Sequence, residues 1–426
     1  MTFSKIGRVL SALVATAALG LGMTACGGGT IGYMWVLGTY YNQISGFKID
    51  QYTGNLTVIN HSPFSSNGSN PVSVIVKPGG RYIYVINSGV TTLTNGKPAI
   101  DPATGLVTQL TNTGSSIAQF NVGGDGVLTF QQTFQTQGVQ PIWAALDSSG
   151  NFLYVLDKFS HYYNGTTDIN GSITVFSVAG DTGKLTLVPN TQILTPGNLP
   201  TLVFEVGANP VMTKVGFGSC LFTLSNTTIY PYQINSSNGQ LTIASTGPYQ
   251  QFPGNSNLSS INTGANSSSN FIFVTDQANN AVYPLQSGGS SACTLSAISG
   301  STTTLPLKNP VMSLTSNNGT YLYVLNQTNT NVIGTANSSI TAYHINAQGQ
   351  LQDNPDSTSN PYSVGSGPVC IIEDPSNQYL YITNGADSTI TGKVFDPTRG
   401  FLSPLTRGSV FPVTKSPTCL AVSGNV

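Results

Sequence analysis

Six segments of the chain share one pattern of apolar, aromatic and polar positions. Aromatic, aliphatic and β-branched residues fill most positions, each segment ends on Asn, Asp or Ser, and turn-forming residues such as PGGR or SSGN precede several of them. This pattern is typical of a β-strand that begins after a tight turn. The segments recur roughly every 50 to 70 residues, a period that indicates a propeller or a solenoid. They are YIYVIN (82–87), FLYVLD (152–157), CLFTLS (220–225), FIFVTD (271–276), YLYVLN (321–326) and YLYITN (379–384).

Each of these aromatic strands belongs to a larger unit of four predicted strands. A strand of similar composition follows it, then a turn that carries Gly in most units and a short strand, which is the expected chemistry of hairpins. An opening strand, led by Pro in most units, precedes it, as in NPVSVIV (70–76), QPIWAAL (140–146), NPVMSLT (309–315) and GPVCIIE (367–373). The strand after the aromatic strand has seven copies: ISGFKI (44–49), SIAQFNV (116–122), SITVFSV (172–178), TIYPYQI (228–234), AVYPLQ (281–286), SITAYHI (339–345) and TITGKVF (389–395).

The two ends of the repeat complement each other. The first unit lacks an opening strand, because GYMWVLGT (32–39) already matches the aromatic strand, whereas SPTCLAVSG (416–424) matches an opening strand with nothing after it. Ring closure explains both features and leaves no unpaired sheet edge. We therefore expect an all-β fold: a seven-bladed β-propeller of four-stranded antiparallel blades, in which the C-terminal strand completes the first blade. Because a radial repeat buries a small core between neighbouring sheets, residues 32–426 are expected to form a single domain.

The first 25 residues differ from the rest and are predicted to be a lipoprotein signal peptide. Lys5 and Arg8 precede an apolar run of about 15 residues, which is shorter than a membrane-spanning helix and is followed by small residues. The sequence LGMTAC resembles the lipobox of bacterial lipoproteins, which implies cleavage before Cys26, lipidation of its thiol and a tether over residues 26–31. The expected localisation is that of an exported, membrane-anchored lipoprotein, periplasmic or at the cell surface. The alternative is an ordinary secretory signal with an incidental Cys.

Composition argues against one class of partner. Only 7% of the residues are charged and the formal net charge is −1, with neutral hydrogen-bonding residues in place of charges. Nucleic acid is not an expected partner, because binding to its phosphates depends on a basic surface.

Four cysteines remain after Cys26, in a compartment that permits disulfides. Cys370 and Cys419 occupy the same place in the opening strands of consecutive units, which places them side by side near the axis. Cys220 begins an aromatic strand and Cys293 precedes the outermost strand of the next unit, on the same face of the ring. We hypothesise pairs 370–419 and 220–293; four cysteines allow three connectivities, and buried free thiols are the alternative.

Essentially the whole chain after residue 31 resembles the YVTN and lactonase-type seven-bladed propellers, which include 6-phosphogluconolactonase-like proteins. The resemblance implies two features of the enzymatic members. An Arg-His pair follows the Pro of the opening strand, and the aromatic strand ends in Asn-Glu. Neither feature is present in this chain, so a general base with a cationic clamp is not expected there. No metal-binding or cofactor-binding motif is present, and we expect neither group. The pairs found after Pro are Val72-Ser73, Ile142-Trp143, Val211-Met212, Val311-Met312, Val369-Cys370 and Thr418-Cys419.

Two long inserts, residues 88–114 and 158–170, follow the aromatic strands of neighbouring units and therefore share a face of the ring. Loops on one face of a rigid scaffold are where binding usually resides. Aromatic and hydrogen-bonding side chains there suit a sugar or a polar peptide, although surface loops without a binding role are the alternative. The candidate binding residues are Trp143, Asp157, Lys158, His161, Tyr162, Tyr163 and Asp168.

Two functions of different classes follow from these observations. The first is a non-catalytic, lipid-anchored binding or scaffold module for a glycan or a protein. The second is a lactonase-type hydrolase or isomerase that uses Asp157 or His161 in unfamiliar positions. A cofactor-dependent propeller is disfavoured, because no set of cofactor ligands is visible.

Overall fold

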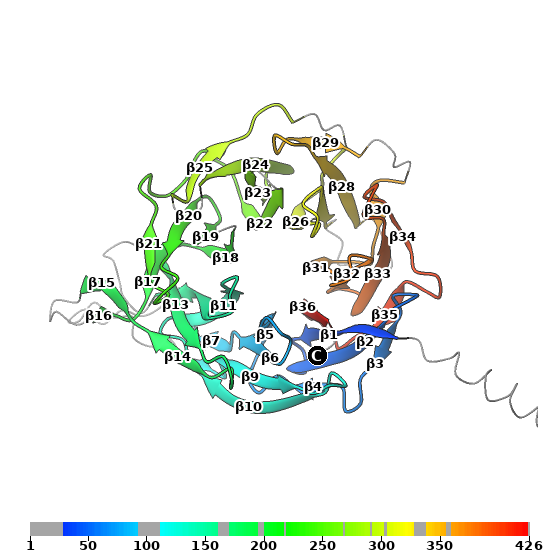
Figure 1. The fold of residues 1–426 in the computed structure, drawn as a ribbon, viewed down its shortest axis with the longest axis horizontal. Coiled ribbons are helices and arrows are strands. Elements are labelled where there is room, and N and C mark those ends of the chain that lie inside the picture. The colour runs from blue at the N-terminus through cyan, green and yellow to red at the C-terminus, as the bar shows by residue number, and fades with distance from the viewer. Residues whose placement is uncertain are drawn as a thin grey trace, which may run out of the picture.

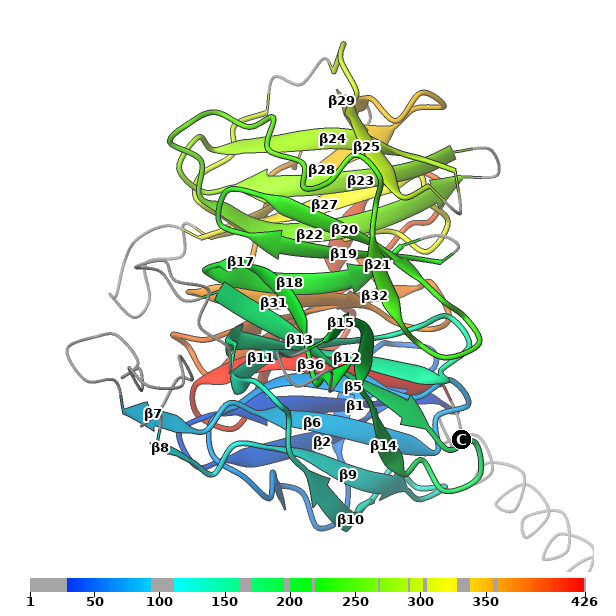
Figure 2. The same cartoon turned by 90° about the vertical axis from the view of Figure 1, so that its left-hand side faces the viewer.

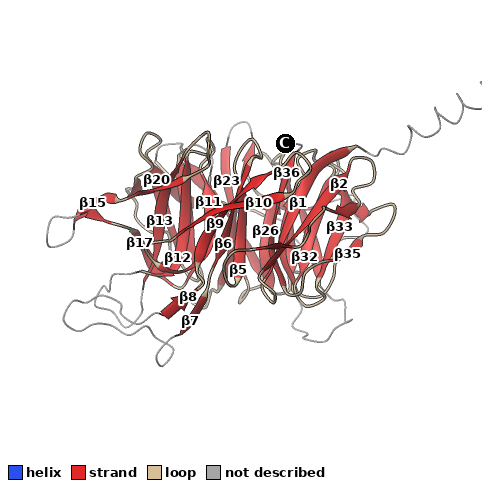
Figure 3. Ribbon diagram, turned by 90° about the horizontal axis from the view of Figure 1, so that it is seen from below, coloured by secondary structure: helices blue, strands red, loops and turns tan. Residues whose placement is uncertain are grey.

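Seven β-sheets are arranged in a ring around a central axis (Figure 1). The computed structural model describes residues 29–92, 111–160, 170–194, 200–216, 219–266, 269–289, 292–301, 305–327, 338–354 and 359–424. These residues form strands, turns and loops and no helix (Figure 3), so none of them forms an apolar helix long enough to cross a membrane. The expected all-β, seven-bladed propeller is confirmed.

Each blade is an antiparallel sheet whose strands run from one face of the ring to the other (Figure 2). From the inside outwards, blade 1 contains β36 (Pro417–Gly424), β1 (Thr30–Gly38), β2 (Gln43–Asp50), β3 (Leu56–Val58) and β4 (Phe64–Ser65). Blade 2 contains β5 (Pro71–Val76), β6 (Tyr82–Asn87), β9 (Ser116–Val122) and β10 (Leu128–Phe134). Blade 3 contains β11 (Val139–Leu146), β12 (Phe152–Phe159), β13 (Asn170–Val178), β14 (Leu185–Val188) and β17 (Phe204–Ala208). Blades 4 and 5 contain β18 (Pro210–Val215), β19 (Cys220–Ser225), β20 (Ile229–Ile234) and β21 (Leu241–Ile243); β22 (Leu258–Asn266), β23 (Ser269–Asp276), β24 (Ala281–Gly288) and β25 (Thr294–Ala297). Blades 6 and 7 contain β26 (Pro310–Thr315), β27 (Tyr321–Asn326), β28 (Ser339–Ile345), β29 (Leu351–Asp353) and β30 (Tyr362–Ser363); β31 (Pro368–Glu373), β32 (Tyr379–Asn384), β33 (Thr389–Phe395), β34 (Leu402–Pro404) and β35 (Val410–Pro412).

The outer edges of the blades depart from a uniform four-strand pattern. In blades 1, 3, 6 and 7, two short strands share the fourth position and both pair with the third strand. Two small hairpins lie outside the blades: β7 (Val90–Thr92) with β8 (Thr111–Thr113), and β15 (Asn190–Leu194) with β16 (Pro200–Thr201). The first extends from one face of the ring (Figure 3), which we call the insert face and which contains the ends of β6 and β12.

The ring closes as the sequence predicts. Strand β36 pairs antiparallel with β1, with Met34 opposite Val422 and Val36 opposite Leu420. The backbone N–H of Thr39 also donates to the carbonyl of Ser416 at 3.1 Å. The C-terminal strand therefore supplies the innermost strand of blade 1 (Figure 1).

A separate hydrophobic cluster fills each of the seven interfaces between neighbouring blades. Between blades 6 and 7, for example, Tyr323 and Leu325 of β27 pack against Leu380 and Ile382 of β32. The aromatic strands are buried on both sides because each contributes to two interfaces, which explains why they read as nearly continuous apolar runs.

The repeated aromatic residues have a defined partner in the next blade. At six interfaces, the first aromatic ring of the strand packs under a glycine in the turn that leads to the outer strand of the neighbour. These glycines have φ between 64° and 83°, and a Cβ atom would clash with the ring, so only Gly fits. Tyr381, the second aromatic residue of its strand, also donates its hydroxyl to the carbonyl of Gly54 at 2.6 Å. The ring–glycine pairs are Tyr33–Gly126, Tyr82–Gly183, Phe152–Gly239, Phe271–Gly349, Tyr321–Gly400 and Tyr379–Gly54.

The seventh interface, between blades 4 and 5, replaces this contact with a disulfide. Cys220 occupies the position of the first aromatic ring, and Cys293, at φ 51°, occupies that of the turn glycine. The two residues are bonded to each other, with a Cα–Cα distance of 5.6 Å. A covalent bond therefore replaces the aromatic contact at the one interface that lacks both of its partners.

Candidate functional site

The centre of the ring is occupied by apolar side chains and by a disulfide. Trp143 of β11 packs against the hydrophobic clusters between blades 3 and 4, 4 and 5, and 7 and 1. Met312 of β26 packs against those between blades 4 and 5, 6 and 7, and 7 and 1. Since each side chain reaches clusters on opposite sides of the ring, both lie close to the axis.

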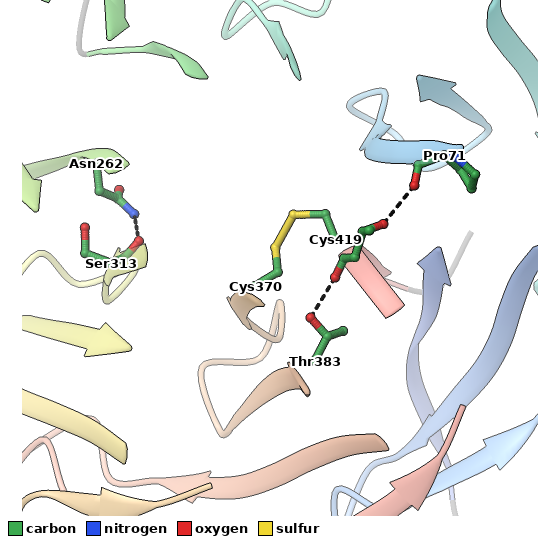
Figure 4. The surroundings of a disulfide bond; sticks show 7 residues. Pro71, Asn262, Ser313, Cys370, Thr383 and Cys419 are labelled. Carbon is green, nitrogen blue, oxygen red and sulfur yellow. Dashed lines mark hydrogen bonds between the residues drawn. A yellow bond between two sulfur atoms is a disulfide. The ribbon is translucent and has the colours of Figure 1, made fainter. Parts of the chain in front are cut away.

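The second disulfide joins the innermost strands of blades 7 and 1. Cys370 and Cys419 are bonded, with a Cα–Cα distance of 5.2 Å (Figure 4). Hydrogen bonds continue around the axis: Thr383 donates to the carbonyl of Thr418 at 2.7 Å, and Thr418 donates to that of Pro71 at 2.9 Å. Both disulfides have the pairing that we expected from the repeat, and this one ties the closing strand to its neighbour.

An asparagine that ends the aromatic strand has a structural role in three blades. Asn326 donates from Nδ2 to the hydroxyl of Thr341 at 2.8 Å, and Asn384 donates to that of Thr391 at 2.9 Å. Asn87 lies at the same position in blade 2 and is fully buried. These amides connect the second and third strands of blades 2, 6 and 7 at the insert face.

Blades 3 and 5 have an acid at this position, Asp157 and Asp276. Burial raises the pKa of Asp276, but hydrogen bonds from neighbouring residues that include Asn279 and Asn257 outweigh this effect and lower the pKa. Asp157 is fully buried, and its Oδ2 accepts a hydrogen bond of 2.8 Å from the hydroxyl of Thr174. Burial raises the pKa of Asp157 to about 7, because an ionised carboxylate loses its hydration there. Hydrogen bonds from Thr136, Thr174 and the backbone of Gly138 lower the pKa and only partly oppose this effect.

A second acid lies two strands away from Asp157. In register, Asp157 is opposite Ser172 of β13, and Ser172 is opposite Glu205 of β17. Burial raises the pKa of Glu205 to about 7, while a hydrogen bond from the hydroxyl of Ser160 to Oε1 opposes the shift. Among the described residues, neither Oε2 of Glu205 nor Oγ of Ser172 has a hydrogen-bond partner. The insert face of blade 3 therefore contains two carboxyl groups whose ordinary charge is disfavoured.

The structure describes two of the other candidate residues, Lys158 and Trp143. Lys158 continues β12 and is half-buried, with Nζ 5.5 Å from the centre of the Phe159 ring. His161, Tyr162, Tyr163 and Asp168 lie outside the described residues, as does Cys26. Trp143 lies at the centre of the ring instead of in the loops.

The sequence analysis did not identify Glu205 as a second acid in the sheet that contains Asp157. Between the outer strand of blade 3 and blade 4, the chain forms the small hairpin of β15 and β16, and β17 then pairs with β13. No repeat pattern marks that pairing. The one available signal was rarity, because the chain contains only two glutamates, Glu205 and Glu373.

No metal centre is visible in the part of the chain that the structure describes. No three His, Cys, Asp or Glu side chains lie close enough together there to hold a metal ion.

Comparison with known proteins identifies the fold. No protein-family model and no curated protein matches the chain. Among solved structures, the periplasmic gluconolactonase PpgL of Pseudomonas aeruginosa aligns with a TM-score of 0.64 at 17% identity, over 93% of this chain and 100% of that one. A 6-phosphogluconolactonase-like protein of Bacteroides uniformis aligns with a TM-score of 0.65 at 16% identity, over 93% and 100% of the two chains. The chain has the fold of the 6-phosphogluconolactonase-like seven-bladed propellers. At such low identity the likeness concerns the fold alone.

Proposed function

We propose that this protein is an extracytoplasmic, lipid-anchored propeller that binds a glycan or a protein and catalyses no reaction. The observation that supports this proposal most strongly is the composition of the ring centre. Trp143, Met312 and the Cys370–Cys419 disulfide lie at the positions where the lactonase resemblance implies an Arg-His pair. Such groups supply neither a general base nor a positive charge to stabilise a developing oxyanion.

The binding surface in this proposal is the rim formed by the inserts of blades 2 and 3. The hairpin β7–β8 extends from the insert face beside blade 3 (Figure 3), and β12 leads directly into the second insert. Lys158, His161, Tyr162 and Tyr163 would contribute a cation, a hydrogen-bonding imidazole and aromatic faces for a sugar ring or a peptide.

A glycan array probed with the full chain tests this function. The double substitution Tyr162→Ala/Tyr163→Ala should abolish binding to the glycans on the array that the wild-type protein binds. Tyr52→Ala is the matched control, because Tyr52 is 74% exposed and lies in the β2–β3 turn on the opposite face. Equal loss of binding in both variants, or binding unaffected by the double substitution, would contradict the assignment to this rim.

The anchor requires a separate test. Cys26→Ala should move the protein from the membrane fraction to the soluble extracytoplasmic fraction, because several acyl chains hold a lipoprotein in the bilayer. Retention of this variant in the membrane would refute lipidation at Cys26.

A second candidate function, lactone hydrolysis, is favoured by one observation. Asp157 and Glu205 have pKa values raised to about 7, which is the range that suits a general base at neutral pH. Turnover of a sugar lactone that Asp157→Asn abolishes would establish this alternative. Glu373→Gln is the control, because burial also raises the pKa of Glu373 to about 7 but this residue ends β31 at the opposite face.

A further inference from the structure

A groove of about 1010 Å³ opens on the outer part of blade 7. Its lining includes Thr391 and Lys393 of β33 and Val410 of β35. Ser363 of blade 6 and Tyr41, in the β1–β2 turn of blade 1, also line it. Its lining residues belong to blades 6 and 7, to the β1–β2 turn and to the segment that precedes β36, and none of them belongs to blade 2 or blade 3. Of the candidate residues that the structure describes, none lines it.

Lys393 is an exception to the internal repeat. Its counterparts in the other six blades are large apolar or aromatic residues, all buried between blades. Only blade 7 has a charged side chain at this position. The counterparts, which pair with the aromatic strand in the same register as Lys393 with Leu380, are Phe47, Phe120, Phe176, Tyr232, Leu285 and Tyr343.

Among the residues that the structure describes, none forms an ion pair with the ammonium group of Lys393. The side chain is 8% exposed, and it forms no hydrogen bond or ion pair with any residue that the structure describes. Desolvation lowers the pKa of Lys393, which means that burial disfavours its positive charge. Because most of the side chain is buried while the residue lines the groove, an anion that entered the groove would stabilise its positive charge.

The remaining charges of the groove are one cation and one anion. Lys415 is exposed, with Nζ 4.0 Å from the centre of the Tyr40 ring. Asp387 also lines the groove, but its Oδ2 accepts the backbone N–H of Ser366 at 2.5 Å. With Lys393, the groove contains two positive charges and one negative charge that is already hydrogen-bonded.

The other lining groups suit a sugar ring. Tyr41 is 60% exposed and Val410 is 62% exposed, so the mouth presents apolar surface on which the C–H face of a pyranose can pack. The hydroxyls of Ser388 and Ser409 lie among the lining groups and can hydrogen-bond to sugar hydroxyls.

We propose that this groove binds an acidic saccharide, with a uronate carboxylate paired to Lys393 and the sugar ring packed against Tyr41. The inference deepens the proposed binding function by naming a ligand class. It concerns a site separate from the loops of blades 2 and 3, so the two proposals can fail independently.

Calorimetric titration of the full chain in detergent tests this proposal. The probes are trigalacturonate and the neutral trigalactose, at the same low salt concentration. Trigalacturonate should bind and trigalactose should bind at least tenfold more weakly, because the charge-assisted hydrogen bonds are missing. Equal binding of both sugars, no binding of trigalacturonate, or equally tight competition by inorganic phosphate would overturn the proposal.

The variant Lys393→Met locates the site. Met is apolar like the residues at this position in the other blades, so the variant should unfold at the same or a higher temperature while its affinity for trigalacturonate falls at least tenfold. Lys184→Met is the matched control, since Lys184 is an exposed lysine in the β13–β14 turn of blade 3. Should Lys393→Met fail to fold, Lys415→Met at the mouth is expected to weaken binding severalfold. Unchanged affinity in the folded lysine variants, or an equal loss in Lys184→Met, would refute the assignment.

Discussion

Replacing Asp157 by Asn should stabilise the protein at neutral and alkaline pH and have little effect in acid. The reason lies in the repeat, because Asn87, Asn326 and Asn384 occupy the same position in other blades. Asn326 and Asn384 donate to a hydroxyl on the neighbouring strand, whereas Asp157 accepts from the hydroxyl of Thr174. The substitution therefore replaces a titrating group with the neutral group that blades 6 and 7 already use.

The magnitude follows from the pKa of Asp157. Its pKa is raised to about 7 by burial in the folded protein, against about 3.9 in an unfolded chain. The unfolded state therefore loses its proton first as pH rises. The stability contributed by the protonated carboxyl is fully present below about pH 4 and is lost progressively until pH passes about 7. A shift of roughly 3 units corresponds to about 4 kcal/mol at most, since each unit is worth 1.36 kcal/mol. Because the side chain is fully buried, solvent screening does not reduce this figure.

Urea unfolding between pH 4 and pH 8, followed by tryptophan fluorescence, measures the effect. The gain in unfolding free energy from Asp157→Asn should increase by about 2–4 kcal/mol across this range. A gain that is constant with pH would show that Asp157 does not titrate in the folded protein between these limits. A loss of stability at every pH would refute the reasoning from the repeat, because it would mean that the site requires a carboxyl group.

Three further predictions concern the contacts between blades. The double variant Cys220→Tyr/Cys293→Gly restores the ring–glycine pair of the other interfaces and should be at least about 1 kcal/mol more stable than Cys220→Ala/Cys293→Ala in urea unfolding. Removing the ring-closing disulfide with Cys370→Ala/Cys419→Ala should cost about 4 kcal/mol by the loop-entropy estimate for its separation of 49 residues, measured in the same way. Gly54→Ala should cost about 2 kcal/mol or more, because Gly54 has φ 68° and a Cβ atom would clash with the tyrosine ring beneath it; a shift in the thermal midpoint reports this loss.

The architecture could be predicted because it depends on local patterns repeated many times. Seven copies of one strand, and an opening strand that is missing at the start and present at the end, determine the blade number and the closure between β1 and β36. The disulfide partners also followed from position in the repeat, since Cys370 and Cys419 share a place in consecutive opening strands.

The sites could not be predicted to the same extent, because they depend on contacts between segments with no shared pattern. Glu205 lies two strands away from Asp157 because β17 returns to pair with β13, and the split outer strands of four blades have no common spacing. The aromatic residues of the repeat were visible in the sequence, but their partners, the turn glycines of the next blade, lie dozens of residues away. Lys393 belongs to a segment that was correctly predicted as a strand. Its burial was not predicted and becomes apparent only in the structure.

Some residues differ from their counterparts in the other blades, and in some of these cases a contacting residue differs as well. Where the two changes compensate each other, we interpret the exception as structural; where nothing compensates, we interpret it as functional. Cys220 lacks the aromatic ring and Cys293 lacks the glycine, but the two changes compensate each other through a bond. The change to Asp157 is partly compensated. Thr174 donates a hydrogen bond to its carboxyl group, and the raised pKa favours the protonated, neutral form. Lys393 has no compensating change among the described residues, so its charge is available to a partner that enters the groove. By this criterion the groove of blade 7 is a stronger candidate for ligand binding than the acidic pair of blade 3.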